Sequence, residues 1–401
     1  MALDTNLATN IIYRGDCYNV LKRNFPSGND KHGVDLIYVD PPFSFDPKYA
    51  KLWYDKESLE MFEEIRKGDV KHYISWMSKR LEQFHRVLKD TGSFYLHCDW
   101  KFGHHLKVAL DDIFGRNNFQ NEIIWWYGGG GASKRRFARK HDTIFFYTKG
   151  KTYTFNIDEV REPYKWTNGQ KRADGTERNY EKGKIPDDVW QMHGLMPWSK
   201  ERKNIGYPTQ KPEVLLERII NASSNEGDII LDPMCGCGTT LVVAHKLKRK
   251  WIGIDISSQA CEVMKKRMSN LGVDVEVKGL PLTLDDLKKL KPFEFQDYIC
   301  DMTNSRKMQY VSDKGIDGLY REEFPVQIKQ QERVGRNVVD NFETALRRKG
   351  RPRGYIIGFS FTKGAYEEAA RAKSDGLDIM LVELPELVRY DYDLESLTKE
   401  A

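Results

Sequence analysis

The sequence predicts an α/β protein with two units, the larger of which is built on a parallel sheet interrupted by an irregular insertion. Three observations support this prediction. Short runs rich in β-branched and aromatic residues alternate with helical stretches, and a polar, Lys- and Gly-rich segment separates two such groups. A further α/β segment follows a Pro- and Lys-rich stretch at residues 279–292, which we interpret as a linker. A chain of 401 residues is also too long for one compact core.

The first group of elements precedes residue 150. Residues 34–39 are an apolar run that two prolines end, which predicts a strand because proline cannot donate a ladder hydrogen bond. Residues 70–88 carry apolar side chains at three- and four-residue spacing, which predicts a helix that Thr91 and Gly92 end. The further strands expected here are residues 93–97, 123–127 and 143–147.

The regular pattern returns at Pro212 after the irregular segment. A helix there is expected to lead into a strand at residues 228–231, a Gly-rich turn and a helix that ends near Leu247. A strand at 251–254 and a helix at 257–270 follow, so helices should cover both faces of the sheet. The expected domains are a first half at residues 1–149, an insertion at 150–206, a second half at 207–280, and a linker with a second domain at 281–401.

The composition narrows the classes of protein that fit. No apolar run approaches the roughly 18–20 residues that span a bilayer, and the amino terminus lacks a basic stretch followed by an apolar one. We therefore expect a cytoplasmic protein without a membrane partner. The 6 cysteines form no Cys-x-x-Cys pair and have no neighbouring histidine at metal-ligand spacing, which favours reduced, buried thiols.

Positive charge is concentrated in the middle of the chain. Residues 125–211 contain 18 Lys and Arg against 10 Asp and Glu, a net charge of +8 in a chain whose total is +5. Such a segment suits a nucleic-acid partner, although a solvated Lys-rich insertion has the same composition.

A Gly-rich turn is expected between the strand at 228–231 and the next helix. Gly236 and Gly238 let the backbone turn sharply and pass close to a ligand. Leu241 stands where a dinucleotide-binding loop needs a third glycine, which disfavours a pyrophosphate ligand. Asp255 ends the following strand at the spacing of a ribose-binding carboxylate, so a nucleoside such as S-adenosylmethionine fits, and purely structural turn glycines are the alternative.

Asp40-Pro41-Pro42-Phe43 follows the first predicted strand, at the edge where open α/β sheets place their ligands. An exocyclic amine is a poor nucleophile because its lone pair is delocalised into the ring. The carboxylate of Asp40 and the carbonyl of Pro41 can each accept one amine hydrogen, and Phe43 offers a face for an extruded base. A simple strand-ending turn is the alternative interpretation of the two prolines.

Taken together, these motifs resemble the β-class DNA amino-methyltransferases of restriction-modification systems. The resemblance covers residues 10–270 and rests on the catalytic tetrapeptide, the Gly-rich turn and three ordered motifs, namely Arg14-Gly15-Asp16-Cys17, Lys140-His141-Asp142 and Tyr207-Pro208-Thr209-Gln210-Lys211-Pro212. It implies a Rossmann-like, S-adenosylmethionine-dependent methyltransferase sheet, with residues 150–206 as a target-recognition region that binds double-stranded DNA.

The resemblance also implies roles for individual residues. Asp16 would contact the adenine of the cofactor, Thr209 and Lys211 its methionine side, and Asp255 its ribose. The other expected cofactor-binding residues are Asp232, Met234, Gly236, Gly238 and Thr239. Met234 departs from the phenylalanine that is usual in the family, and Cys237 from the frequent serine.

The resemblance also favours one target base. Aspartate is typical of adenine-N6 enzymes and serine of cytosine-N4 enzymes, so we favour adenine and retain cytosine-N4 as the alternative. Cytosine-C5 chemistry is disfavoured because the chain has no Pro-Cys dipeptide. A non-catalytic DNA-binding protein on the same scaffold and an RNA or nucleotide methyltransferase are the rival functions. The protein could act as a homodimer or with a separate restriction subunit.

The carboxyl-terminal segment carries a second motif. Asp317 lies in a predicted turn, and Gln327 and Lys329 share one face of a strand at residues 324–329, so Asp317 could bind Mg²⁺ while Lys329 orients a water. Residues 292–385 resemble the Mrr-like branch of the PD-(D/E)xK nucleases, in which Gln can replace the second acid. An active nuclease, a degenerate DNA-binding fold and an unrelated α/β cap remain open, because an amide weakens a cation site.

Overall fold

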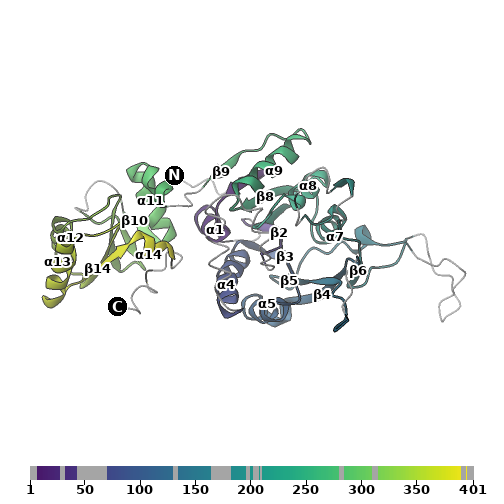
Figure 1. Cartoon of the computed structure of the whole chain (residues 1–401), viewed down its shortest axis with the longest axis horizontal. Helices are drawn as coiled ribbons and strands as arrows, with labels where there is room; N and C mark the ends of the chain where they lie inside the picture. The colour runs from purple at the N-terminus through teal and green to yellow at the C-terminus, as the bar shows by residue number, and fades with distance from the viewer. Residues whose placement is uncertain are drawn as a thin grey trace, which may run out of the picture. The chain divides into compact units, whose positions relative to one another are not determined.

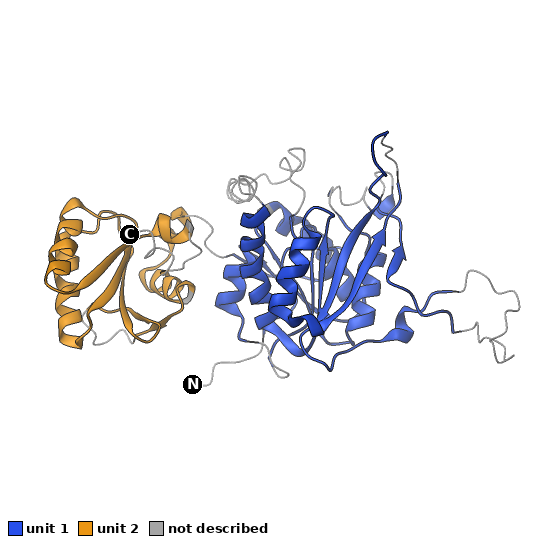
Figure 2. Cartoon of the chain, turned by 90° about the horizontal axis from the view of Figure 1, so that it is seen from below, with its two compact units in different colours: residues 1–280 blue, residues 281–401 orange. Residues whose placement is uncertain are grey.

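The computed structural model describes residues 7–27, 32–42, 70–129, 134–163, 182–195, 199–201, 207, 210–279, 284–308, 315–389 and 394. Two expected site residues, Phe43 and Thr209, lie outside these ranges. The chain divides into two compact units, Met1–Leu280 and Pro281–Ala401, each of which is considered by itself (Figure 2).

The first unit is built on a nine-stranded sheet with the strand order β6-β4-β5-β3-β2-β7-β8-β1-β9 (Figure 1). Its strands are β1 (Ile11–Arg14), β2 (Val34–Val39), β3 (Leu88–Cys98), β4 (Phe119–Trp126), β5 (His141–Thr148), β6 (Val189–Gln191), β7 (Ile229–Asp232), β8 (Lys250–Asp255) and β9 (Val277–Gly279). The six strands from β3 to β9 in this order pair in parallel, as expected of an α/β sheet.

One strand contradicts the expectation of a parallel sheet. β5 runs antiparallel to both of its neighbours, β3 and β4. The apolar pattern of a strand does not encode its direction, which depends on the connection that precedes it. As a consequence the beginning of β5 lies beside the end of β3, where Thr143 is opposite Cys98.

Helices cover both faces of this sheet, as predicted, and each face has its own apolar core. One core involves α1 (Cys17–Asn24), α4 (Val70–Val87) and α5 (Gly103–Leu110); the other involves α7 (Glu213–Ser223), α8 (Thr239–Lys246) and α9 (Ser258–Ser269). A π-helical turn at Asp111–Gly115 and 3-10 turns at Arg116–Asn118 and Ile157–Val160 complete the unit. All 6 cysteines lie in the described ranges, are buried and form no disulfide, which confirms the prediction for them.

The helix predicted at residues 70–88 is α4, but its end differs from the prediction. β3 begins at Leu88, directly after the helix, so Thr91 and Gly92 lie within the strand. The pairing of β2 with β3 shifts register here, because Val34 is opposite Leu88 whereas Leu36 is opposite Ser93. The irregularity accommodates the additional residues of β3 between Leu88 and Ser93.

The second unit has a five-stranded sheet of order β10-β11-β12-β13-β14, parallel from β12 to β14 and antiparallel elsewhere. Its strands are β10 (Ser305–Lys307), β11 (Gly318–Tyr320), β12 (Phe324–Lys329), β13 (Arg353–Gly358) and β14 (Asp378–Glu383). Its helices are α10 (Leu284–Lys289), α11 (Pro292–Met302), α12 (Arg336–Lys349), α13 (Lys363–Ser374) and α14 (Leu384–Arg389).

The expected linker is partly wrong, because α10 lies inside it. Leu287 of this helix is buried in the apolar core of the second unit. A six-residue helix with two lysines carries too few apolar residues for its periodicity to be read from the sequence. In the part of the chain that the structure describes, none of the helices is long and apolar enough to cross a membrane.

Candidate active site

Four neighbouring parallel strands each bring an aspartate to one edge of the large sheet. In the order of the sheet, Asp40 follows β2, Asp232 ends β7, Asp255 ends β8, and Asp16 lies two residues beyond β1. The carboxyl ends of parallel strands meet at the same edge, so chain segments far apart in the sequence form one site.

Asp40 uses one of its carboxylate oxygens and leaves the other without a partner. Oδ2 pairs with Nζ of Lys211, whereas Oδ1 is buried and has no hydrogen-bond partner among the described residues. A buried acceptor without a donor is costly, so a donor from a ligand would be bound favourably there. Pro41, the next residue, is also buried.

A buried histidine network lies at the same edge. Nδ1 of His97 is 3.0 Å from the hydroxyl of Tyr38, and Nε2 is 3.1 Å from Oδ2 of Asp142. Because a carboxylate only accepts, Nε2 donates to Asp142 and Nδ1 of a neutral ring accepts from Tyr38. Burial alone would raise the pKa of Asp142, but the hydrogen bond from His97 and the charge of Lys211 outweigh it and lower that pKa. The network is therefore electrostatically connected to the ion pair of Asp40.

His97 was not predicted from the sequence as a site residue. It was expected in a strand without a role, because only the antiparallel pairing of β5 brings Asp142 beside it. One signal was present, since His97 is a polar residue between Leu96 and Cys98 at the end of a fully apolar run. Its side chain is completely buried, and buried polar groups need partners.

The Gly-rich turn connects β7 to α8 through two glycines with positive φ. Gly236 has φ +50° and Gly238, which precedes α8, has φ +75°. A Cβ at Gly238 would also lie 2.6 Å from Cγ of Met264, so both the conformation and the space require glycine. Thr239, the first residue of α8, is buried and accepts a 3.3 Å hydrogen bond from Arg267.

Two of the four aspartates accept hydrogen bonds from residues in or beside this turn. Asp232 accepts hydrogen bonds from the hydroxyl of Thr240 and, at 3.2 Å, from the amide of Met234. Asp255 accepts from the amides of Gly236 at 2.7 Å and Ser257 at 2.9 Å. These hydrogen bonds fix both carboxylates against the turn.

The crowding of acids has an electrostatic consequence. Burial, together with the charges of Asp40 and Asp255, raises the pKa of Asp232 to about 7, although its hydrogen bonds oppose this shift. A positively charged ligand beside Asp232 would favour its deprotonated form.

Asp16 is close to Asp255 but is bound to protein groups. Arg14 pairs with Asp255 in the sheet, and the amide of Gly15 donates to the Asp255 carbonyl at 2.9 Å. Oδ1 of Asp16 caps α1, and Oδ2 forms a 2.6 Å ion pair with buried Arg80. The carboxylate of Asp16 is thus fixed at one end of the row of carboxylates, which consists of Asp40, Asp232, Asp255 and Asp16.

In the second unit, the structure brings together the three residues that the sequence singled out. Asp317 accepts a 2.7 Å hydrogen bond from the amide of Ile328, between Gln327 and Lys329 on β12. Burial raises the pKa of Asp317, and the charge of Lys329 partly opposes this effect. Oε1 of Gln327 is buried and lacks a partner within the described ranges.

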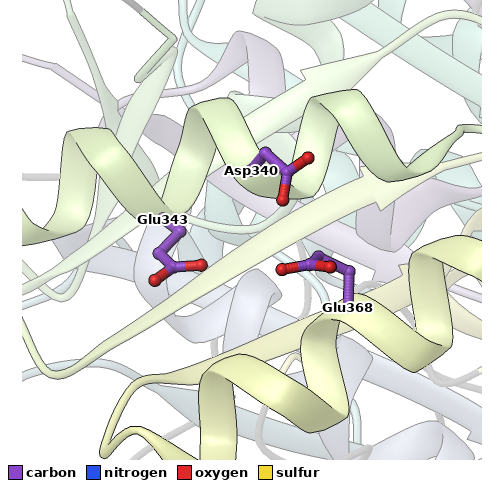
Figure 3. A group of neighbouring side chains, drawn as sticks. All are labelled: Asp340, Glu343 and Glu368. Carbon is purple, nitrogen blue, oxygen red and sulfur yellow. The ribbon is translucent and has the colours of Figure 1, made fainter.

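A separate cluster of acids joins α12 and α13 in the second unit. Asp340, Glu343 and Glu368 face one another across the two helices (Figure 3). Arg371 pairs with Glu343 and Glu368, and Arg336 pairs with Glu368 at 2.8 Å and with Asp340 at 3.7 Å. Since arginines already compensate these carboxylates, we interpret the cluster as an ion-pair network between helices.

Comparison with known proteins adds to this geometry. Residues 34–266 match a family model described as DNA methylase, and residues 287–390 match one described as restriction endonuclease. The type II methyltransferase M.HpaI of Haemophilus parainfluenzae is 33% identical over 67% of this chain and 76% of its own length. The DNA adenine methyltransferase YhdJ of Escherichia coli is 33% identical over 66% of this chain and 83% of its own length. Among solved structures, an M1.HpyAVI–SAM complex matches 64% of this chain and 98% of its own with 22% identity and a TM-score of 0.41.

Proposed function

Because the chain belongs to the DNA methylase family of amino-methyltransferases, we propose that it methylates the N6 of adenine in double-stranded DNA with S-adenosylmethionine as the methyl donor. One observation carries the proposal. Asp40, at the carboxyl end of a central strand, has a buried oxygen without a partner in the described part of the chain. An aspartate at this position also favours adenine over cytosine, whose N4 remains the alternative target.

The row of carboxylates and the turn at Gly236 and Gly238 support the proposed donor. S-adenosylmethionine supplies an electrophilic methyl group on a positively charged sulfonium. Burial is the largest cause of the raised pKa of Asp232, and the nearby charges of Asp40 and Asp255 add to it, so a cation beside Asp232 would favour its charged form. Asp16 and Asp255 would hold the nucleoside, and the remaining proposed contacts are Thr209, Lys211, Met234 and Thr239.

The residues of the tetrapeptide would prepare the amine. Oδ1 of Asp40 and the carbonyl of Pro41 would each accept one amine hydrogen, which draws the nitrogen toward tetrahedral geometry. Lys211 holds the other oxygen of Asp40, so the accepting oxygen is positioned before the base arrives. Pro42 fixes the backbone, and Phe43 would stack on the extruded base.

We propose residues 150–206 as the target-recognition region. The described part of this insertion includes β6, which extends the large sheet beside β4, so the region is attached to the catalytic fold. The excess of Lys and Arg over the wider segment of residues 125–211, which contains this insertion, suits the phosphate backbone of a duplex.

Single-molecule sequencing of DNA from cells that express the full chain tests the proposed function. N6-methyladenine in one sequence context is the expected result. N4-methylcytosine would select the alternative target. Absence of any modified motif, with purified protein that still binds S-adenosylmethionine, would favour a DNA-binding scaffold.

A second candidate function is Mg²⁺-dependent cleavage of DNA by the second unit. The observation that favours it is the buried Oε1 of Gln327, which has no partner among the described residues and belongs to the strand whose Ile328 amide donates to the carboxylate of Asp317. The oxygens of Gln327 and Asp317 would hold the cation, and Lys329 would orient the attacking water. With only one carboxylate, the site should bind Mg²⁺ weakly.

A further inference from the structure

The loop between β4 and β5 presents a phenylalanine almost entirely to solvent. Phe137 is 98% exposed, more than any other large hydrophobic residue among those described. It lies in a basic stretch that contains Lys134, Arg135, Arg136, Arg139 and Lys140. The ring and the basic residues beside it together offer an apolar face and positive charge, which suits a partner with both apolar and anionic surfaces.

The base of this loop is fixed to the protein. The guanidinium of Arg139 lies 3.3 Å from the ring centre of Trp100, a cation–π contact. The carbonyl of Lys140 accepts a 3.1 Å hydrogen bond from the amide of Tyr127, and Nζ of Lys140 donates to the carbonyl of Gly129. These contacts hold the segment just after Phe137 against the sheet.

The anchors of the loop lie at the catalytic edge. Trp100 follows the carboxyl end of β3, where His97 is located. Asp142, five residues after Phe137, binds His97 and is influenced by the charge of Lys211, the partner of Asp40. Phe137 therefore projects from the edge at which an extruded base would be methylated.

We propose that Phe137 is a wedge that enters the base stack of duplex DNA and fills the gap left by the target base, an inference that rests on the proposed function. Extrusion of a base exposes the apolar faces of its neighbours, and an aromatic ring can cover them. The neighbouring arginines suit the phosphates on either side of the gap. This assigns the loop to duplex DNA, separately from the recognition of sequence by residues 150–206.

The test is methylation of two duplexes by the full-length protein and its Phe137→Ala variant. One duplex carries the recognised motif fully paired, and the other has an abasic site opposite the target adenine, which lowers the cost of extrusion. On the paired duplex the variant should lose about 10- to 100-fold in kcat/KM, the range for loss of a stacking contact. The abasic duplex should restore most of this loss, and Phe137→Trp should retain activity on both.

Phe293→Ala, which removes an exposed phenylalanine from the second unit, is the matched control and should leave both rates unchanged. A wild-type rate for Phe137→Ala on the paired duplex would overturn the wedge. So would an equal loss on both duplexes, because it would indicate a general DNA contact. Methylation of the paired duplex by the wild-type protein is the positive control, so a failure of the proposed function is recognised separately.

Discussion

The two carboxylate oxygens of Asp40 have different surroundings. One oxygen holds Lys211, and the other has no partner within the described chain. Asp40→Ala should lower kcat of methyl transfer by at least the roughly 10²–10³-fold seen when one preorganised polar contact is removed. Binding of S-adenosylmethionine should change little, because this side chain would face the base. Single-turnover methylation and calorimetric titration measure the two effects.

Asp35 provides a matched control on the same strand. It also pairs with a lysine, Lys89 at 2.7 Å, and it accepts a 2.9 Å hydrogen bond from the amide of Ile229 at the opposite end of β2. Asp35→Ala should therefore reduce stability but leave the rate of methyl transfer per folded molecule intact. Joint loss of cofactor binding and methylation in Asp40→Ala would mean that Asp40 contacts the cofactor instead.

The raised pKa of Asp232 predicts a pH-dependent affinity for the methyl donor. Burial and the charges of Asp40 and Asp255 raise this pKa to about 7, so Asp232 loses its proton as the pH rises through that value. Binding of a cation favours the deprotonated carboxylate, so affinity should increase from pH 6 to pH 8. S-adenosylhomocysteine has the same amino acid moiety but no sulfonium charge and should show a smaller increase.

Calorimetric titration of both ligands at the two pH values measures the difference. In Asp232→Asn the side chain carries no charge at either pH, so the ratio of the two affinities should become independent of pH. An equal pH dependence for the two ligands in the wild-type protein would contradict the proposed position of the sulfonium near these carboxylates.

At the scale of elements, the turn between β7 and α8 can be tested with two glycines of similar conformation. Gly238 has φ +75° and Gly272, after α9, has φ +77°. A Cβ at Gly272 would meet nothing within 4 Å, whereas one at Gly238 would lie 2.6 Å from Cγ of Met264. Gly272→Ala should cost about 1–2 kcal/mol for the left-handed backbone alone. Gly238→Ala should cost about 1–3 kcal/mol more, because a buried clash is added.

Urea unfolding measures both free energies, and cofactor titration separates the two variants further. Only Gly238→Ala should weaken binding of S-adenosylmethionine, since Gly272 lies outside the row of carboxylates. Similar destabilisation by both variants would show that Met264 moves aside and that the close contact does not constrain the turn.

The sequence predicted elements whose pattern is local and missed features that depend on pairing. The strand β2, the helix α4 and the turn around Gly236 each follow from residues that are adjacent or one helical turn apart. The hydrogen bond between His97 and Asp142 depends on the direction of β5, which no local pattern encodes. The ion pair of Lys211 with Asp40 joins residues 171 positions apart, so it could not be predicted from a local pattern either.

At the scale of the whole molecule, one chain combines a methyltransferase unit with a restriction endonuclease-like unit, and each unit has its own apolar cores. The separate cores mean that a substitution at one site should not unfold the other unit. The two proposed activities can therefore be inactivated one at a time within the full chain.

If the second unit cleaves unmethylated DNA, methylation by the first unit must protect the host. Asp40→Ala should abolish protection but leaves Asp317, Gln327 and Lys329 unchanged, so a plasmid that encodes this variant should give far fewer transformants than the wild type. Lys329→Ala removes the charge beside Asp317 and should restore transformation in the double variant, and alone it should leave methylation intact. Cleavage by purified Asp40→Ala should require Mg²⁺ and spare methylated plasmid. Equal transformation by Asp40→Ala and the double variant, with intact DNA in vitro, would identify the second unit as a DNA-binding fold without nuclease activity.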